Sequence, residues 1–414
     1  MSHGWRESLS PEQRLLLGLA RIELGPERDA EVRRVIESGL DWQELVALAV
    51  RHGIPNLVFH HLRALDLGAS VPAPTWQQLE RHHATARLCS MRQRWETTRI
   101  LDAFSEGGIE VMALKGIVLR ETLYPDPGMR ASGDVDIMIR RPEWRRAAAC
   151  LESIGYRVAA GADIGDSYTP DDFHHMAPYE SPNGGVMVEV HWHLVPCVLH
   201  VDARELWQRA AELHLEGRTL WRLSGEDQFL HLCVHAAQTA FNTGLRHLID
   251  VAELERTGVF DEDVIVSRSA RWGIQRHVAT TVRLVDELIG GSQLCRSIAD
   301  RTQAPAGVVA ALREAVLDTG RRKRADRGSG MAQAVTMLRG RRWSELLGKL
   351  FPNRRYMERA YRLAPGSMLA LPLYVLRPFL LAARYGLAFP SAPARRRYRL
   401  RMWLRSEAGA KGEE

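Results

Sequence analysis

Hydrophobic positions in the first ninety residues or so recur every three to four residues, which is the period of an amphipathic helix. Ser10 and Pro11, followed by Gln13, form a typical helix start ahead of a run of leucines. We therefore expect a helical N-terminal region over residues 1–95. Its further helices are expected at 42–53, 57–65 and 76–101.

The period changes at residue 109. A short apolar run ends at Lys115 and Gly116, and strand patterns then alternate with helical ones up to residue 200. This alternation indicates a single α/β or α+β unit with a mixed sheet over residues 96–200. The expected elements are strand 109–114, helix 117–123, strand 135–139, helix 142–153 and strand 186–194.

Helical periodicity returns after Pro196, which predicts a second helical domain over residues 201–319. The fold class expected for the chain is α+β (α/β), with a small mixed β-sheet core flanked by N- and C-terminal helical regions. Residues 320–414 form a basic C-terminal region interrupted by prolines. The helices expected in the second domain are 226–240, 245–256, 270–289 and 308–317.

The composition is that of a globular protein, with 45% hydrophobic and 26% charged residues among 414, and it excludes a wholly disordered or collagen-like chain. The five cysteines include no CxxC pair, so neither a zinc knuckle nor a disulfide framework is indicated. The N-terminus shows no secretory signal pattern. Together these features favour a cytoplasmic protein.

The charge is distributed unevenly along the chain. Residues 320–406 hold 21 Arg or Lys against three acids, a balance of +18, whereas residues 1–319 carry −10. The basic region is either a solvated surface or a contact for anionic lipid or nucleic acid. Apolar residues over 369–387 favour peripheral lipid contact over RNA, but prolines and arginines interrupt this stretch, so no transmembrane span is expected.

Two acids stand on the strand expected at 135–139. Because successive side chains of a strand point to opposite faces, Asp134 and Asp136 share one face, while Val135 and Ile137 share the other. Neighbouring carboxylates repel, and folding tolerates them best when a cation neutralises both. An Asp-x-Asp pattern alone is weak evidence for a metal site, because chance and solvated strand ends often produce it.

The strand expected at 186–194 adds a third acid. Glu189, His191 and His193 share its polar face, so three carboxylates converge if this strand lies beside the first. Either histidine is a candidate proton acceptor or phosphate contact, with a solvent-facing histidine as the alternative. Upstream, Lys115 and Gly116 lie at a strand-to-helix turn, where backbone N–H groups can approach a phosphate.

Other histidines allow more than one interpretation. His231 and His235 are four residues apart on an expected helix and are either zinc ligands or packed groups beneath the site. His235 and Asp250 form either an outer layer of the site or an ordinary buried polar pair.

The order of these residues along the chain resembles the DNA polymerase β-like nucleotidyltransferase superfamily. That order is Gly116 at a turn that opens a helix, then Asp134 and Asp136 on a strand, then Glu189 on a later strand. Over residues 40–260 the sequence more closely resembles a branch of bacterial nucleotidyltransferase family proteins. One position departs from the superfamily pattern, because Ile117 follows the turn glycine where Gly or Ser is usual, so a hydroxyl ligand for phosphate is missing there. The residues that carry the closer resemblance are Lys115, Tyr124, Arg130, Gly155, Tyr156, Glu189, His191, Trp192, His235 and Asp250.

The resemblance implies Mg²⁺-dependent (or Mn²⁺-dependent) transfer of a nucleoside monophosphate from an NTP to an unidentified hydroxyl acceptor. Asp134, Asp136 and Glu189 would be the catalytic metal ligands. A catalytically inactive nucleotide- or partner-binding module with the same fold is the alternative. The residues implied for nucleotide binding are Lys115, Gly116, Arg130 and His191.

Overall fold

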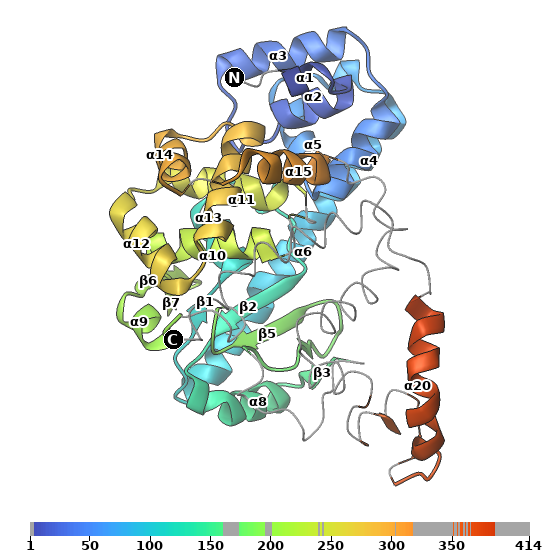
Figure 1. Ribbon diagram of the computed structural model, residues 1–414, viewed down its shortest axis with the longest axis vertical. Helices are drawn as coiled ribbons and strands as arrows, with labels where there is room; N and C mark the ends of the chain where they lie inside the picture. The colour runs from blue at the N-terminus through green and yellow to red at the C-terminus, as the bar shows by residue number, and fades with distance from the viewer. Residues whose placement is uncertain are drawn as a thin grey trace.

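The computed structural model describes residues 4–159, 174–194, 201–238, 241, 244–302, 304–317 and parts of 351–385. The N-terminal helices lie at one end of the molecule, a second group of helices lies in the middle, and the β-sheet lies at the other end (Figure 1). The prediction of a mixed α and β fold with flanking helices is confirmed.

Local sequence signals determine the N-terminal helices. Ser10 and Gln13 form a complete capping box at the start of α2, and α4 ends where Gly53 adopts a left-handed conformation with φ of 72°. The helices of this region are α1 (Gly4–Glu7), α2 (Pro11–Gly18), α3 (Pro26–Glu37), α4 (Trp42–His52) and α5 (Pro55–Ala64).

One long helix, α6 (Ala73–Glu106), joins the N-terminal helices to the sheet. Its 34 residues extend the helix expected over 76–101 at both ends. Near its start, Trp76 packs on Phe59 of α5, with ring centroids 4.9 Å apart. Near its other end, Arg99 donates to the carbonyl of Ile154, the residue that follows the helix over Trp144–Ser153. The long helix α6 therefore contacts both the N-terminal helices and the sheet region.

The sheet has seven strands in the order β3-β4-β5-β2-β1-β7-β6. The central strands β2 and β5 run parallel, although β3 and β4 lie between them in sequence. Along the chain, the helix α7 (Lys115–Thr122) lies between β1 and β2, and the helix α8 (Trp144–Ser153) lies between β2 and β3. The strands are β1 (Met112–Ala113), β2 (Asp134–Met138), β3 (Arg157–Val158), β4 (Tyr179–Glu180), β5 (Met187–His191), β6 (Ala211–Leu215) and β7 (Arg218–Arg222).

The expectation that residues 201–319 are all helical is wrong for 211–222. These residues form the antiparallel hairpin β6–β7, and β7 pairs with β1, so they extend the sheet. The two-residue turn at Glu216 and Gly217 has positive φ at both positions, which matches the twist of a tight hairpin. Leu213 and Leu220 are paired partners and both are buried, which supplies the apolar contact for this pairing.

Both faces of the sheet are covered. Val135 and Ile137 pack into a core with Phe104 of α6 and Leu151 of α8. On the opposite face, Met138 belongs to a second, larger core that includes the C-terminal helices. The face of β2 that carries the acids is therefore covered by helices. The C-terminal helices are α9 (Ala203–Gln208), α10 (Gly225–Gln238), α11 (Arg246–Thr257), α12 (Glu262–Trp272), α13 (Gln275–Leu284), the π-helix η4 (Val285–Ile289), α14 (Gln293–Thr302) and α15 (Ala306–Leu317).

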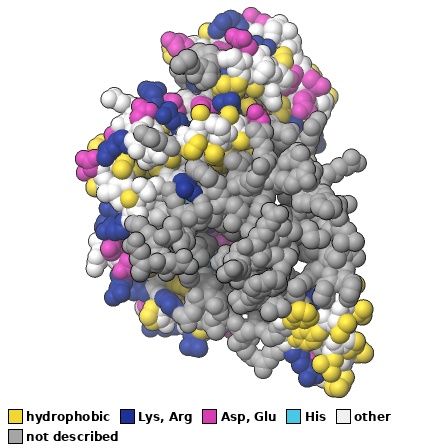
Figure 2. All heavy atoms as spheres, in the orientation of Figure 1, with side chains coloured by type: hydrophobic (Ala, Val, Ile, Leu, Met, Phe, Trp, Pro, Cys, Tyr) yellow, Lys and Arg dark blue, Asp and Glu magenta, His cyan; other side chains and the backbone are white. Residues whose placement is uncertain are grey.

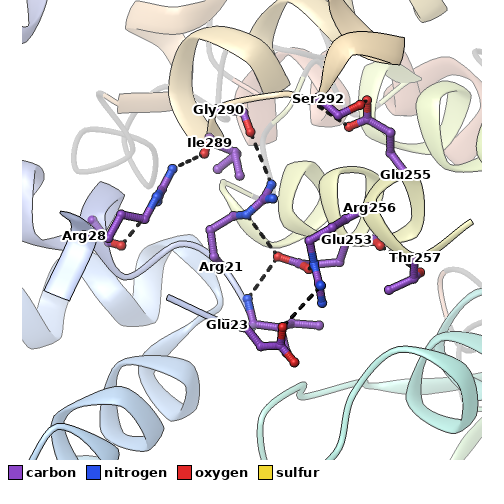
Figure 3. Close-up of polar contacts among 12 residues, drawn as sticks. Arg21, Glu23, Arg28, Glu253, Glu255, Arg256, Thr257, Ile289, Gly290 and Ser292 are labelled. Carbon is purple, nitrogen blue, oxygen red and sulfur yellow. Dashed lines mark hydrogen bonds and ion pairs between the residues drawn. The ribbon is translucent and has the colours of Figure 1, made fainter. Parts of the chain in front are cut away.

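Arginines of the N-terminal region bind the C-terminal helices (Figure 3). Arg21 pairs with Glu253 of α11 at 3.3 Å and donates to the carbonyl of Gly290. Arg28 donates to the carbonyl of Ile289, so two guanidinium groups satisfy carbonyls at the end of η4. Because Glu253 is fully buried, these contacts join the two helical regions into one packed unit.

Most of the basic region expected over 320–414 lies outside the described residues. Its described helix, α20 (Ala370–Tyr385), lies to one side of the body (Figure 1). Among the helices that the structure describes, none is long and apolar enough to cross a membrane.

Candidate metal and nucleotide site

The two acidic strands are neighbours in the sheet, as the convergence of three carboxylates requires. In the parallel register of β2 and β5, Asp136 stands opposite Glu189, and Met138 stands opposite His191. Directly paired residues project on the same face, so these side chains meet beneath the C-terminal helices. Asp134 stands opposite Met187 at the start of β2, where its side chain is only half-buried.

The closest group of potential ligands is Asp136, Glu189 and His191, with one donor atom from each lying within 4.8 Å of the others. His191 Nε2 lies 3.1 Å from Asp136 Oδ1 and 3.6 Å from Glu189 Oε2. Asp134 is outside this group. The structure thus brings together two of the three expected metal ligands, together with a histidine that the sequence assigned to the nucleotide.

Lys115 supplies a positive charge to the same carboxylate. Its Nζ lies 2.7 Å from Asp136 Oδ1, and the residue has a φ of 41°, a left-handed conformation that is unfavourable for a lysine. Such strain persists only where the surroundings enforce it, and it is common at functional sites. The turn therefore directs the ammonium group at the acidic strand.

The two aspartates of β2 differ in the direction of their pKa shifts. Burial raises the pKa of the Asp136 carboxyl, but the hydrogen bond from His191 and the charge of Lys115 outweigh it and hold that pKa far below its usual range. Burial and the neighbouring charge of Asp136 raise the pKa of Asp134. A hydrogen bond from His191 lowers the pKa of Glu189. Asp136 is thus the paired acid, and Asp134 lacks sufficient compensating charge.

His191 is buried against these acids. Burial lowers its pKa, but hydrogen bonds to Asp136 and Glu189 more than reverse this and raise the pKa above its usual value. His193, expected on the same face, instead bonds through Nε2 to the carbonyl of Val201. The two histidines thus have different partners: His191 contacts the acids, and His193 contacts the carbonyl of Val201.

The expected glycine turn is present at the start of α7. The helix begins at Lys115 without a side-chain cap among the described residues, so backbone N–H groups remain at its N-terminus. Ile117, which follows the turn glycine, is 3% exposed and packs in the core. Residue 117 therefore contributes no hydroxyl to the turn.

Arg130 is anchored by α11. Its Nε and Nη2 each donate to Asp250 at 2.8 Å, and the hydroxyl of Tyr124 donates to the same carboxylate at 2.8 Å. Both charged residues are buried, and the charge of Asp250 raises the pKa of Arg130 despite the opposing effect of burial. Asp250 thus pairs with Arg130 and Tyr124. These contacts connect the loop before β2 to the C-terminal helices.

Two histidines of α10, His231 and His235, lie within electrostatic reach of Asp136. The rings of His231 and His235 lie 6.4 Å apart, and burial lowers the pKa of both, to about 4 for His235. The only ligand group found among the described residues does not include either of them, which disfavours the zinc interpretation. His174 and His175, which sequence reasoning missed, pack on His191 with ring centroids 5.8 and 5.3 Å away.

The donor set fits a divalent cation. Two carboxylates and one imidazole nitrogen face each other in a buried site, and Asp134 lies two residues away on the same strand face. Carboxylate oxygens suit Mg²⁺ and Mn²⁺, and an imidazole is better accepted by Mn²⁺ than by Mg²⁺. The lysine and the uncapped helix start add positive potential beside the acids, an arrangement suited to a substrate that carries phosphates.

Comparison with known proteins agrees with this chemistry. No curated protein and no solved structure matches the chain. The model of one family, described as uncharacterised nucleotidyltransferase, matches residues 38–290, which is more than half of the chain and includes every ligand discussed above. On the basis of this match, the chain belongs to that nucleotidyltransferase family.

Proposed function

We propose that the protein transfers a nucleoside monophosphate from an NTP to a hydroxyl acceptor in a reaction that depends on Mg²⁺ or Mn²⁺. The observation that carries the proposal is the register of β2 and β5, which sets Asp136 opposite Glu189 on one face of the sheet, two residues from Asp134. Membership in a nucleotidyltransferase family supports the general chemistry.

The proposed metal ligands are Asp134, Asp136 and Glu189, with His191 Nε2 as an additional donor. Divalent cations in this site would neutralise the polyphosphate and lower the pKa of the acceptor hydroxyl. In the overall reaction the acceptor oxygen forms a bond to the α-phosphorus, the bond to the bridging oxygen breaks, and pyrophosphate leaves. The raised pKa of Asp134 is consistent with this assignment, because an under-compensated carboxylate gains most from a bound cation.

The chain's own residues would bind and orient the nucleotide. Lys115 Nζ, now on Asp136, is close enough to the acids to contact a phosphate bound between them and the helix start. Gly116 allows the phosphate to approach the backbone N–H groups of α7. His191 holds Asp136 and Glu189 in place, and its raised pKa favours a hydrogen-bond donor at this position over an acceptor for the hydroxyl proton.

A label-transfer assay tests the proposal. The full-length protein is incubated with each α-³²P-labelled NTP, Mg²⁺ or Mn²⁺, and a fractionated cell extract. We expect labelled product with the wild type and none with Asp134→Ala, while Asp102→Ala, which changes an exposed acid on α6, should behave as wild type. Nucleotide binding without transfer by the wild type would instead support an inactive nucleotide-binding module.

We further propose that the basic C-terminal region contacts an anionic lipid surface. Apolar side chains on and just before α20 face solvent, including Met368 and Val375 at 71% and 68% exposure, while Arg377 is buried beside Tyr361. Figure 2 shows the apolar patch on this helix. An exposed apolar face within a chain segment that has a charge balance of +18 is the pattern of an interfacial helix.

A further inference from the structure

We propose that Ser132 and Arg130 form an anion-binding cradle at Gly116 that holds the polyphosphate of the nucleotide. This inference rests on the proposed function and deepens it, because it identifies the source of the hydroxyl that the glycine turn lacks. The cradle has three parts: the start of α7, the hydroxyl of Ser132 and one amino group of Arg130.

The side chains of the loop before β2 crowd Gly116. A Cβ built on Gly116 would lie 2.7 Å from Ser132 Oγ and 3.3 Å from Arg130 Nη1. Any larger residue at 116 would thus displace the serine hydroxyl. Because residue 116 has no side chain, the hydroxyl of Ser132 and the guanidinium group of Arg130 can both lie close to the start of α7.

The donors at this point have unused capacity. Arg130 is 6% exposed, and its Nε and Nη2 are committed to Asp250, whereas Nη1 has no hydrogen-bond partner among the described residues. Ser132 Oγ donates only to the carbonyl of Asp134, over a long 3.2 Å. The Nη1 atom itself keeps some contact with solvent, so an anionic oxygen can reach it and accept its hydrogen bond.

Backbone contacts from two other elements fix the cradle. The carbonyl of Ser132 accepts a hydrogen bond of 3.1 Å from Gln93 of α6. The carbonyl of Ala131 accepts one of 3.2 Å from Arg246 of α11. With Arg130 held by Asp250, three consecutive residues are anchored, so the hydroxyl is positioned before any ligand binds.

The relocation of the hydroxyl has a physical reason. Residue 117 lies on the face of α7 that packs into the core, and Ile117 fills that place. A hydroxyl at 117 would have to leave the core to meet a phosphate. Ser132, in the loop before β2, lies against the same glycine and avoids this conflict.

Binding of inorganic tripolyphosphate in metal-free buffer tests the cradle without base, sugar or cation. We expect Ser132→Ala to bind tripolyphosphate roughly tenfold more weakly than wild type by calorimetry, because a hydrogen bond to a charged group is lost. Ser153→Ala removes an exposed serine hydroxyl on α8 and is the matched control, with unchanged binding. Arg130→Lys, which keeps a positive charge for Asp250 but removes Nη1, should also weaken binding.

The outcomes separate the cradle from the proposed function. Wild-type binding that Ser132→Ala leaves unchanged, or no tripolyphosphate binding by the folded wild type, overturns the cradle whatever the transfer assay shows. Weakened binding in Ser132→Ala together with no label transfer by the wild type keeps the cradle and removes the enzymatic proposal. Far-ultraviolet circular dichroism of each variant shows whether the fold is retained.

Discussion

Replacing Asp136 by asparagine should destabilise the metal-free protein by about 2–3 kcal/mol. Asp136 is 2% exposed, and its carboxylate contacts Lys115 Nζ at 2.7 Å and His191 Nε2 at 3.1 Å. Removing one partner of a buried charged pair costs about 3–5 kcal/mol. The Lys115 side chain keeps 16% exposure, so its ammonium can turn toward water and recover part of that cost.

The same substitution at Asp134 should not destabilise the protein. Burial and the charge of Asp136 raise the pKa of Asp134, which means that the folded state disfavours the charged form. Above that pKa the ionised carboxylate lowers the free energy of unfolding, so Asp134→Asn should leave stability unchanged or increase it at pH 7. Both variants should nevertheless abolish transfer, because each removes a proposed metal ligand.

Urea unfolding in buffer with EDTA, followed by tryptophan fluorescence, measures both effects. Lys115→Met combined with Asp136→Asn completes a double-mutant cycle, and we expect a coupling energy of about 1–3 kcal/mol. Asp102→Asn breaks a pair with Arg218 that is largely exposed, and it should cost less than about 1 kcal/mol. Additive effects in the cycle, or an Asp136→Asn protein as stable as wild type, would refute the assignment of Asp136 as the compensated acid.

Three further predictions follow from the geometry. Gly116→Val should weaken NTP binding well beyond any loss of stability, because a Cβ there meets a serine hydroxyl at 2.7 Å; unchanged affinity by calorimetry would move the phosphate site elsewhere. Burial lowers the pKa of His61 and His235 to about 4, so between pH 6.5 and 4 the unfolded chain binds more protons than the folded protein. Acidification from pH 7 to 5.5 should therefore lower the free energy of unfolding, measured by urea titration, by about 1 kcal/mol per histidine. Val375→Asp should reduce sedimentation with phosphatidylserine vesicles in low salt, whereas Val259→Asp, at a fully exposed position, should not; RNA binding without vesicle binding would contradict the lipid proposal.

Much of the fold followed from local patterns. The capping box at Ser10, the stop at Gly53 and the alternation around Asp136 each depend on a few adjacent residues, and each was found where expected. The hairpin at 211–222 was missed although its signals are local too: Glu216-Gly217 supplies a tight turn, and buried leucines alternate around it. The neighbouring helical segments concealed this short strand pattern.

The arrangement of the site depended on contacts distant in sequence. That Asp136 and Glu189 share a face was predictable from strand alternation, but their direct pairing requires β5 to enter the sheet beside β2 after two intervening strands. The bond between Arg130 and Asp250 spans 120 residues, and nothing in either local pattern indicates it. The anchored loop over residues 130–132 could be recognised only once α6 and α11, the helices whose side chains hold it, were placed.

These long-range contacts bear on whether the helical region is an accessory to the sheet. Asp250 of α11 fixes Arg130, and Arg246 of the same helix fixes the next carbonyl of the loop that leads into β2. The position of Asp134 therefore depends on α11 as well as on its own strand. Glu253, about one turn beyond Asp250 on α11, pairs with Arg21, so the N-terminal region contacts the same helix (Figure 3). The acidic face of the sheet thus depends on α11, and the family match over residues 38–290 includes this helix as well as the sheet.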